Sequence, residues 1–349
     1  MRTRLSAAAI AGVTAAVAAL AGGGAVPAAA APSGARAVPV PAGAGTVNSS
    51  HANRVVGHGT PASCTSAAVV AAVRAGGIIR FACGPKPVTI RMKATAKVEN
   101  TNARVVLDGG GRITLSGEGR RRILYMDTCD RVQIWTTSHC QDQATPVLVV
   151  ENISFVGGNS TGQHFDGGGG GAIFARGGRL RIVNATFAGN RCDPWGADLG
   201  GGAVRALSQY HGLPLYVVGS RFTGNVCTNG AALSSIGVSW TVLNSRFFAN
   251  RAIGGGANHG GAGGGGSGGA IYNDGDRMTL AIAGSLFTGN HANEGGGAVF
   301  FTSNDRTGTM SIRNSTLEDN PSDAFHTRGL PGIFFLGARR PTILHSILR

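Results

Sequence analysis

Residues 171–190, with the sequence GAIFARGGRLRIVNATFAGN, contain the unit that decides the fold. The unit opens with two small residues and an aliphatic one, and it closes on a phenylalanine followed three residues later by asparagine. The opening step stands at Gly171-Ala172-Ile173, Gly202-Ala203-Val204, Ala231-Ala232-Leu233, Gly269-Ala270-Ile271 and Gly297-Ala298-Val299. The closing pair stands at Phe187/Asn190, Phe222/Asn225, Phe247/Asn250, Phe287/Asn290 and Leu317/Asn320, after an imperfect copy at Phe155.

The units recur at unequal distances. Successive closing positions from Phe155 to Leu317 are 32, 35, 25, 40 and 30 residues apart, so the unit is constant and the connecting loops vary. Such a repeat is typical of a solenoid, in which each unit buries its apolar face only against its neighbours. The apolar runs within a unit are too short for helices and alternate with period two, which predicts three short strands per unit. A globular sandwich is the alternative, but it would not explain residue identities that recur across loops of changing length.

An Asn or Gly residue precedes each closing residue by three positions. These residues are Asn152, Asn184, Gly219, Asn244, Gly284 and Asn314. Both residue types tolerate the left-handed backbone conformation, so we expect a bend between two strands at this position of every unit. If the units stack as parallel coils about 4.8 Å apart, equivalent Asn side chains form a hydrogen-bonded ladder and equivalent aliphatic side chains form an interior stack.

These repeats resemble the right-handed parallel β-helix of the pectin-lyase-like superfamily, and the paired GGA(I/V) and FxxN elements are similar to the repeats of polymorphic outer-membrane proteins. The resemblance covers roughly residues 65–345 and implies an all-β fold, a right-handed parallel β-helix solenoid. Residues 65–75 predict a short N-terminal helix capped by Ser63 or Thr65. This helix is similar to the one that closes the N-terminal end of such solenoids.

Composition divides the chain into three segments. Residues 1–31 predict a secretory signal peptide, because Arg2 and Arg4 precede an apolar, alanine-rich stretch that ends near Ala31. An uncleaved membrane anchor is the alternative, but the apolar run is short for a span of about 20 residues. Residues 32–60, rich in Pro, Ala, Gly and Ser, are expected to form a flexible linker, and residues 61–349 the β-helix. We expect the mature chain to be secreted and extracellular, without a membrane span.

The chain has 6 cysteines, all of which follow the predicted signal peptide. Cys64/Cys83 and Cys129/Cys140 are local pairs by spacing. Cys192 and Cys227 each lie two residues after the closing Asn of consecutive units, so stacking would place them about 4.8 Å apart, within the Cα separation that a disulfide accepts. We therefore predict three disulfides, which indicate an oxidising compartment.

The charge of the chain favours anionic partners. Lys and Arg total 31 against 17 for Asp and Glu, a net charge of +14, which is typical of proteins that bind acidic polymers or surfaces. Basic runs such as Arg120-Arg121-Arg122 and Arg339-Arg340 are short and lack interleaved aromatic residues, which disfavours nucleic acid. We expect an acidic polysaccharide or another cell-surface polymer as the partner.

The resemblance places ligands on the outer face of the strand that carries the GGA(I/V) step. Residues one position after the inward aliphatic residue should then point outward in one row: Phe174, Arg205, Ser234, Tyr272 and Phe300. Two positions further on stand Arg176, Leu207, Ile236, Asp274 and Thr302. Aromatic and arginine side chains in such a row stack on sugar rings and pair with uronate carboxylates. We select Phe174, Arg176, Arg205, Tyr272, Asp274 and Phe300 as candidate ligand-binding residues; the alternative is that long loops cover the row.

Asp274, Asp276 and Asp305, with Arg277 and Arg306 beside them, form the densest cluster of charge. Carboxylates at this spacing coordinate calcium through oxygen ligands, and calcium is the one cofactor that the sequence suggests. The competing interpretation is turn-forming Asp paired with surface Arg. The longest loops also fall at one place in the unit, about 157–170, 191–201, 251–268 and 291–296, and carry His164, Asp166, Asp193, Trp195, Asp198, His259, His291 and Glu294.

Glycoside hydrolysis needs a pair of fixed carboxylates, and the chain lacks the adjacent aspartates that hydrolases of the resembled family carry. The leading hypothesis is therefore a secreted β-helix that binds an extracellular anionic polysaccharide or cell-surface polymer without strong catalysis. The first alternative is a calcium-dependent, pectate-like polysaccharide lyase with Arg205 as its base. A third is a structural adhesin whose ligand is a protein.

Overall fold

The computed structural model describes residues 34–164, 167–256 and 264–349. The predicted signal peptide, residues 1–31, lies outside these ranges, as do Asp166 and His259. None of the helices in the described ranges combines the length and the hydropathy needed to cross a membrane.

Strands of the described residues form three sheets. The largest sheet contains 17 strands: β1 (Arg54–Val56), β2 (Gly77–Phe81), β3 (Val88–Arg91), β5 (Arg104–Ser116), β7 (Val147–Val156), β9 (Arg179–Val183), β10 (Thr186–Ala188), β12 (Leu215–Val218), β13 (Arg221–Thr223), β16 (Trp240–Leu243), β17 (Arg246–Phe248), β20 (Thr279–Ala283), β21 (Leu286–Thr288), β24 (Thr309–Arg313), β25 (Thr316–Glu318), β27 (Thr342–Leu344) and β28 (Ile347–Leu348). The second contains 8: β4 (Ala96–Lys97), β6 (Leu124–Asp127), β8 (Ile173–Arg176), β11 (Val204–Leu207), β15 (Leu233–Ile236), β19 (Ile271–Gly275), β23 (Val299–Ser303) and β26 (Ile333–Leu336). The third contains 3: β14 (Val226–Cys227), β18 (Arg251–Ala252) and β22 (His291–Ala292).

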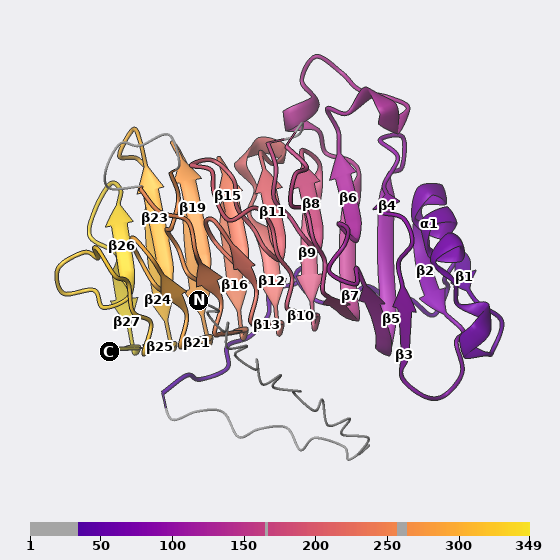
Figure 1. The fold of residues 1–349 in the computed structure, drawn as a ribbon, viewed down its shortest axis with the longest axis horizontal. Coiled ribbons are helices and arrows are strands. Elements are labelled where there is room, and N and C mark those ends of the chain that lie inside the picture. The colour runs from indigo at the N-terminus through magenta and orange to yellow at the C-terminus, as the bar shows by residue number, and fades with distance from the viewer. Residues whose placement is uncertain (1–33, 165–166, 257–263) are drawn as a thin grey trace, which may run out of the picture. The chain divides into compact units, whose positions relative to one another are not determined.

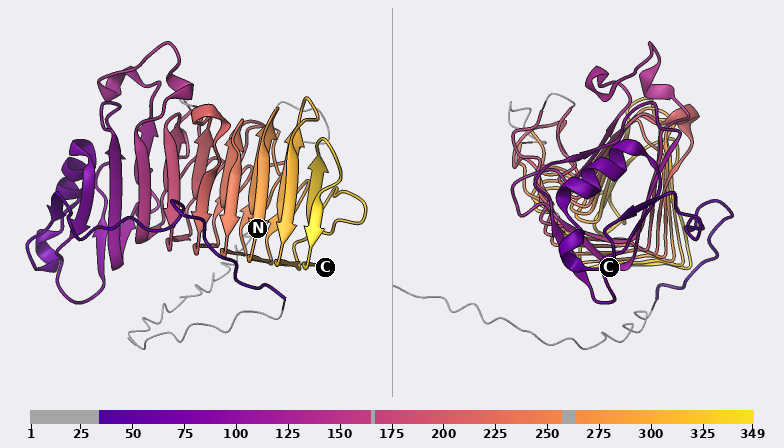
Figure 2. Two further views of the ribbon diagram at one scale, coloured as in Figure 1. Left: turned by 180° about the vertical axis from the view of Figure 1, so that it is seen from behind. Right: turned by 90° about the vertical axis from the view of Figure 1, so that its right-hand side faces the viewer.

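Neighbouring strands in all three sheets run parallel. In the eight-stranded sheet the strands follow one another in chain order from β4 to β26, and Figure 1 shows them standing in a row. Seen from the end, successive turns of chain superimpose around a common interior (Figure 2). The prediction of an all-β chain of stacked parallel strands is confirmed.

The interior is built from the residues that recur in the sequence. Ile173, Val204, Leu233, Ile271 and Val299 are paired in register on neighbouring strands and fully buried. The closing phenylalanines form a continuous ring stack, with centroid separations of 5.1, 4.7, 4.8 and 4.3 Å from Phe155 through Phe187, Phe222 and Phe247 to Phe287. Ring stacking of this kind adds to the free energy of burying each aromatic side chain.

The asparagine ladder forms on the closing asparagines. Each side-chain amide donates to the carbonyl oxygen of the next side chain, at 2.8–2.9 Å, along Asn190, Asn225, Asn250, Asn290 and Asn320. These side chains are buried, so each hydrogen bond satisfies groups that would otherwise be desolvated without a partner. Among the bend asparagines the structure has one such step, from Asn184 to Asn152 at 3.3 Å.

The bends adopt the expected backbone conformation. The φ angles are 50° at Asn152, 49° at Asn184, 57° at Gly219, 51° at Asn244, 62° at Gly284 and 49° at Asn314. All six lie in the left-handed region that Asn and Gly occupy most easily. This conformational requirement explains why the two residue types alternate at one position of the unit.

All three predicted disulfides are confirmed. They join Cys64 to Cys83, Cys129 to Cys140 and Cys192 to Cys227. The Cα atoms of Cys192 and Cys227 are 4.8 Å apart, the separation expected for equivalent positions on stacked strands. The coil alignment used to interpret the sequence therefore holds at this point.

Helix α1 (Ser66–Ala75) begins after Thr65, whose hydroxyl accepts a hydrogen bond from the Ala68 amide at 3.2 Å. The helix lies at the end of the row of strands, near β1, β2 and β4 (Figure 1). Short 3-10 turns are η1 (Pro61–Ser63), η2 (Arg131–Gln133), η3 (Cys140–Asp142) and η4 (Tyr210–Gly212).

The segment expected to be a flexible linker, residues 32–60, contains β1, which pairs with β2. Residues 34–53, here named the strap, make backbone and side-chain hydrogen bonds to turns far along the chain, from Asn314 to Ile78. Ala44 of the strap is fully buried. The strap therefore packs on the 17-stranded sheet.

Candidate functional site

The candidate site is the outward-facing row of the eight-stranded sheet. Its residues pair in register along consecutive strands in the order Lys97, Tyr125, Phe174, Arg205, Ser234, Tyr272, Phe300 and Phe334. Side chains alternate between the two faces of a strand, so this row points away from the interior, as the sequence predicted. A second outward row, two residues further on, runs Asp127, Arg176, Leu207, Ile236, Asp274, Thr302 and Leu336.

Most of the first row is covered. Phe174 and Ser234 have no exposed surface, Arg205 is 1% exposed and Tyr272 8%. Loops that precede the strands lie over these side chains: the carbonyl of Asp198 accepts a hydrogen bond from Arg205. The expectation of a long exposed ligand row is thus wrong over its middle, and the alternative, that loops cover it, describes these residues.

Arg122 packs over the rings of Tyr125 and Phe174, which are two residues of the first row. Its guanidinium lies 4.9 Å from the centre of the Phe174 ring and 5.5 Å from that of Tyr125. It also donates to the carbonyl oxygens of Gly169 and Gly170, at 2.7 and 3.2 Å. A buried arginine that satisfies loop carbonyls and stacks on two rings fixes the loop to the sheet.

Arg205, predicted as a ligand residue and as the base of a lyase, is a buried structural cation. Nη1 donates to the Ser234 hydroxyl at 2.5 Å. Burial lowers the pKa of its guanidinium to about 10, opposed by the nearby Tyr272, Asp198 and Asp274. The group therefore stays protonated at neutral pH, and its position beneath the loop keeps it from a polymer in solution.

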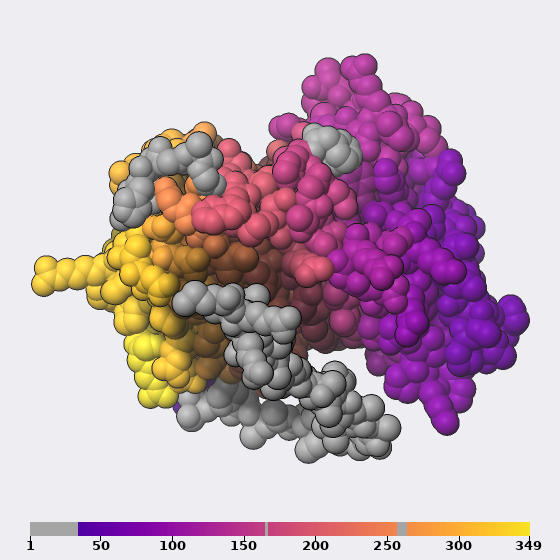
Figure 3. Space-filling view, viewed as in Figure 1, coloured from indigo at the N-terminus to yellow at the C-terminus, as the bar shows by residue number. Residues whose placement is uncertain are grey.

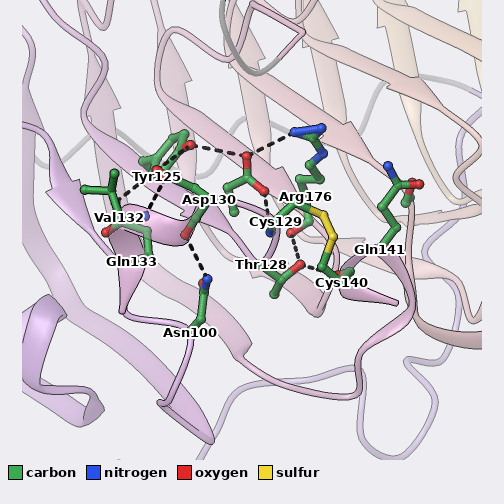
Figure 4. A network of polar contacts seen from close by, with 12 residues as sticks. Asn100, Tyr125, Thr128, Cys129, Asp130, Val132, Gln133, Cys140, Gln141 and Arg176 are labelled. Atoms are coloured by element: carbon green, nitrogen blue, oxygen red, sulfur yellow. Dashed lines mark hydrogen bonds and ion pairs between the residues drawn. A yellow bond between two sulfur atoms is a disulfide. The ribbon is translucent and has the colours of Figure 1, made fainter. Parts of the chain in front are cut away.

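Asp127 forms polar contacts with Tyr125, Cys129 and Arg176, which Figure 4 shows at the N-terminal part of the row. Its side chain is 1% exposed and lies 3.3 Å from Nη1 of Arg176, the predicted ligand residue of the next strand. The Cys129 amide donates to Oδ1 at 2.8 Å, and the Tyr125 hydroxyl lies 3.2 Å from Oδ2. Burial raises the pKa of Asp127 although Arg176 acts against this shift.

The Tyr125 hydroxyl also lies 3.2 Å from Oδ2 of Asp130. Asp130 accepts from the Val132 amide and from the Gln133 side chain, at 2.9 and 3.0 Å. These contacts tie β6 to the excursion between β6 and β7, which the Cys129–Cys140 disulfide closes (Figure 4). The network therefore holds this excursion in place.

A second Tyr–x–Asp pair occurs on β19. The Tyr272 hydroxyl donates to Oδ2 of Asp274 at 3.2 Å, and Asn304 and the Gly275 amide contact Oδ1 at 3.3 and 2.7 Å. Burial raises the pKa of Asp274 and that of the Tyr272 phenol. The pair thus repeats the arrangement of Tyr125 and Asp127, without a direct arginine contact to the carboxylate.

The predicted calcium group is not assembled. Among residues 34–164, 167–256 and 264–349, no group of three or more His, Cys, Asp or Glu side chains is placed to hold a metal ion. Asp305 instead accepts hydrogen bonds from the Thr307 amide and hydroxyl at 2.9 and 2.8 Å, and from Ser303 at 3.0 Å. The main-chain carbonyl of Asp276 accepts from Ser303 at 2.8 Å. These are turn contacts, so the turn interpretation of the acidic cluster is the one that the geometry supports.

The loop side chains pair with one another. Nε2 of His164 lies 2.9 Å from Asp193, and that of His291 lies 2.8 Å from Asp323. Glu294 accepts a hydrogen bond from the Gly256 amide at 2.8 Å. Trp195 remains 60% exposed. The acidic residues of these loops therefore organise the loops.

The outer row opens at its C-terminal end. Phe300 and Phe334 are half-buried and stack with centroids 4.8 Å apart, while Tyr272 stacks on Phe300 at 5.0 Å. Phe325, also half-buried, meets Phe300 and Phe334 edge-on at 6.4 and 5.0 Å. This aromatic platform lies on the last coils, coloured orange to yellow in Figure 3.

A pocket of about 350 Å³ adjoins the end of β26. It is lined by Arg306, Thr327, Arg328, Phe335, Leu336, Gly337, Arg339, Arg340 and Pro341. Leu336 follows Phe334 by two residues on the outward face of β26, so the pocket continues from the aromatic platform. None of the described lining residues is acidic, and none of the four arginines forms an ion pair with a described carboxylate.

The sequence prediction therefore included Phe300 of this end and missed its arginine pocket. Arg339-Arg340 is visible in the sequence as a basic pair, and it lies between β26 and β27 of the last coil. Arg306 and Arg328 come from two other loops, and no sequence pattern joins them. Comparison of the chain with protein-family models, with characterised proteins and with solved structures finds no match.

Proposed function

We propose that this protein is a secreted, right-handed parallel β-helix that binds an extracellular acidic polysaccharide at its C-terminal end. The observation that carries the proposal is the pocket lined by Arg306, Arg328, Arg339 and Arg340, without a described carboxylate among its lining residues. The four guanidinium groups have no ion-pair partner among the described residues, so an anionic ligand would supply the missing counter-charge. Each guanidinium also offers planar, bidentate hydrogen bonding to a carboxylate or sulfate.

The aromatic platform supports a sugar polymer as the source of the anions. Phe300, Phe325 and Phe334 present half-buried rings beside the pocket. Flat apolar rings suit the apolar faces of pyranose units, while the arginines suit acidic groups on the same chain. Alternation of apolar and anionic surface along one ligand is a property of polyuronates and sulfated polysaccharides.

Right-handed winding is inferred from the parallel pairing, because parallel strands joined by crossover connections are right-handed in about 98% of cases. We also infer that α1 closes the N-terminal end of the interior, since its buried Val69 and Val73 belong to the main apolar core. Secretion is supported by three disulfides, which persist in oxidising compartments.

The test is a binding titration of the purified mature chain with a polyuronate, a sulfated polysaccharide and a neutral polysaccharide of similar length. We expect saturable binding to the acidic polymers that weakens as salt shortens the Debye length from about 10 to about 3 Å. The double variant Arg339→Ala/Arg340→Ala should bind about tenfold or more weakly, because it removes charge-assisted hydrogen bonds. Arg112→Ala, an exposed arginine of β5 outside the pocket lining, is the matched control.

Failure to bind any polyanion, or equal losses in the pocket and control variants, would remove the proposal. Ultraviolet absorbance of unsaturated product in the same mixtures, with and without calcium, tests the lyase alternative. Product formation would replace the binding function with a catalytic one.

A further inference from the structure

The strap lies along an outward groove of the 17-stranded sheet and meets successive turns in reverse order. The Arg36 amide donates a hydrogen bond to the Asn314 carbonyl at 2.9 Å. Further along the strap, the Val38 and Val47 amides donate to the side chains of Asn244 and Glu151. At the C-terminal end of the strap, the Asn53 amide donates to the Ile78 carbonyl at 3.1 Å. The strap therefore runs from the C-terminal coils to β2, against the direction in which the coils are built.

The groove recognises the main chain of the strap. Asn244 accepts from the Val38 amide at 2.8 Å and donates to the Val38 carbonyl at 2.9 Å, so one side-chain amide satisfies both polar groups of one residue. Arg181 donates to the carbonyl of Gly43. Such contacts with backbone groups bind an extended chain with little dependence on its side chains.

The bend position of the repeat forms one wall of the groove. A Cβ atom at Gly284 would lie 3.0 Å from the Arg36 carbonyl oxygen and 3.3 Å from the Val38 nitrogen. The glycine therefore leaves room for the strap where the neighbouring Asn244 binds it. Alternation of Asn and Gly at this position, which the left-handed bend permits, also shapes the groove.

An apolar floor fixes the register of the strap. Ala44 is fully buried against Val183, Val218 and Leu243, which are outward residues of β9, β12 and β16 and pair in register. Val38 packs on the same cluster. Ala44 has no exposed surface and contacts apolar side chains, so the floor selects a small apolar residue at this position.

Two carboxylates hold the other end. Glu151 accepts from the Val47 amide at 2.8 Å, and Asp108, its register partner on β5, accepts from the Ser49 hydroxyl at 2.5 Å. Asp108 is also held by the Asn152 side chain at 3.0 Å. Oε1 of Glu151 is buried without a hydrogen-bond partner among the described residues, so this end of the groove is held less completely than the Asn244 end.

We propose that this groove is a peptide-binding site whose resident ligand is the chain's own strap, and that the vacated groove accepts the strap of a second copy of this chain. The geometry selects this occupant, because the small apolar floor and the Asp108 carboxylate are complementary to the side chains of Ala44 and Ser49 of this sequence. Covalent attachment gives the resident strap an effective concentration in the millimolar range. A free strap therefore binds only when the resident one is displaced.

The test uses the full mature chain and a labelled synthetic peptide of residues 34–52. Ala44→Asp places a charge on the apolar floor and should expel the resident strap without altering a coil, so this variant should bind the peptide saturably. Adding Asn244→Gly, which removes the side-chain amide and keeps a residue suited to the left-handed bend, should weaken peptide binding about tenfold or more, because two hydrogen bonds to the strap backbone are lost. Ala42→Asp, which changes an exposed strap residue, is the matched control and should bind no more peptide than the unmodified chain.

Three outcomes of this test would contradict the proposal. No binding by an Ala44→Asp chain that unfolds cooperatively, equal binding with and without Asn244→Gly, or equal binding by the unmodified chain each contradicts it. If Ala44→Asp does not fold, Val47→Pro replaces it and is judged by the same outcomes. This substitution removes the amide hydrogen that is donated to Glu151, and it leaves every coil residue unchanged.

Discussion

Two outward faces of the coils are covered, and they are covered in different ways. The eight-stranded sheet is covered by loops that belong to its own coils, and the covered groups include Arg205 and Tyr272. The 17-stranded sheet is covered along the strap by one remote segment, and most contacts there involve main-chain atoms or small apolar side chains. A loop cover is anchored at both ends within one coil, whereas the strap is anchored to the sheet through β1 at its C-terminal end.

The difference separates permanent from releasable cover. Loss of the loop cover would expose a buried guanidinium and two carboxylates with raised pKa values, Asp127 and Asp274. Loss of the strap would expose a short apolar patch and one buried carboxyl group, that of Glu151, and would free a few hydrogen bonds. Local opening of a protein follows such differences in contact and burial, so the four predictions below compare the two faces.

The largest effect is expected at the disulfide that anchors the loop cover. Cys192→Ala/Cys227→Ala should lower the free energy of unfolding by about 4 kcal/mol, because the bridge closes a long loop in the unfolded chain. Cys129→Ala/Cys140→Ala, with a sequence separation of 11 instead of 35, should lower it by about 3 kcal/mol. Denaturant unfolding measures both. If the Cys129/Cys140 variant lost more free energy of unfolding than the Cys192/Cys227 variant, the entropy of the unfolded chain would not determine how much each disulfide stabilises the fold.

Arg205→Ala should destabilise the fold by about 2–3 kcal/mol, because loop and sheet acceptors lose a charge-assisted donor. Binding of acidic polysaccharide should not change, since Arg205 is buried. Arg339→Ala should do the reverse, with weaker binding and unchanged unfolding. If Arg205→Ala lost binding at unchanged stability, Arg205 would be a ligand-binding residue and this prediction would be wrong.

Glu151 gives the strap face a pH dependence. Burial raises the pKa of Glu151 from 4.5 to about 6, with Asp108 acting in the same direction and the Val47 amide and Arg181 opposing it. A raised pKa contributes stability that is complete below pH 4.5 and is lost as the pH rises through about 6. Unfolding measured between pH 4 and 7 should therefore show a decrease on the order of 1 kcal/mol that Glu151→Gln removes.

Asp108→Asn is the control for this experiment. Hydrogen bonds from Ser49, Asn152 and Gly110 hold the pKa of Asp108 below 3.8 against the effect of burial. Its contribution is therefore present above pH 3.8 and is lost as the pH falls below that value. An Asp108→Asn chain should keep the larger part of the change between pH 4.5 and 6, because burial is the main cause of the raised pKa of Glu151 and Asp108 adds a smaller rise.

The last prediction concerns exchange rates in the unmodified chain. The Val38 and Val47 amides donate to groove side chains, and the Asn250 amide donates within the interior ladder. We expect the two strap amides to exchange about a hundredfold or more faster than the Asn250 amide, because the strap opens without the coils. Equal protection, measured by hydrogen exchange, would make the strap part of the cooperative core.

Much of the fold was predictable because its contacts repeat. Phe187, Phe222 and Phe247 stack on one another, so residues that recur in the sequence are also the residues that are in contact. Cys192 and Cys227 occupy equivalent positions of neighbouring units, and their bridge was predicted from that equivalence alone. An asparagine ladder was predicted at the bends, where the structure has the single step from Asn184 to Asn152, and the long ladder instead lies on the closing asparagines.

For the candidate site, the sequence predicted only which side chains point away from the interior. Strand alternation correctly pointed Phe174 and Arg205 outward, but their burial depends on loops of unequal length that follow no period. Asp274 and Asp276 are close in sequence and Asp305 lies one coil further on, yet hydrogen bonds within a turn use Asp305. The arginine pocket gathers side chains from loops of different coils, so it has no signature in the sequence.

The sequence by itself determined the coil: its strands, its left-handed bends, its interior stacks and its disulfides. These features arise between equivalent residues of neighbouring units, where spacing in the chain and spacing in space are related by a constant rise of about 4.8 Å. Only the tertiary structure decided what covers the coil. The strap has the composition of a linker, yet it becomes ordered because Asn244, Glu151 and the floor around Val218 come together only after the coils have stacked.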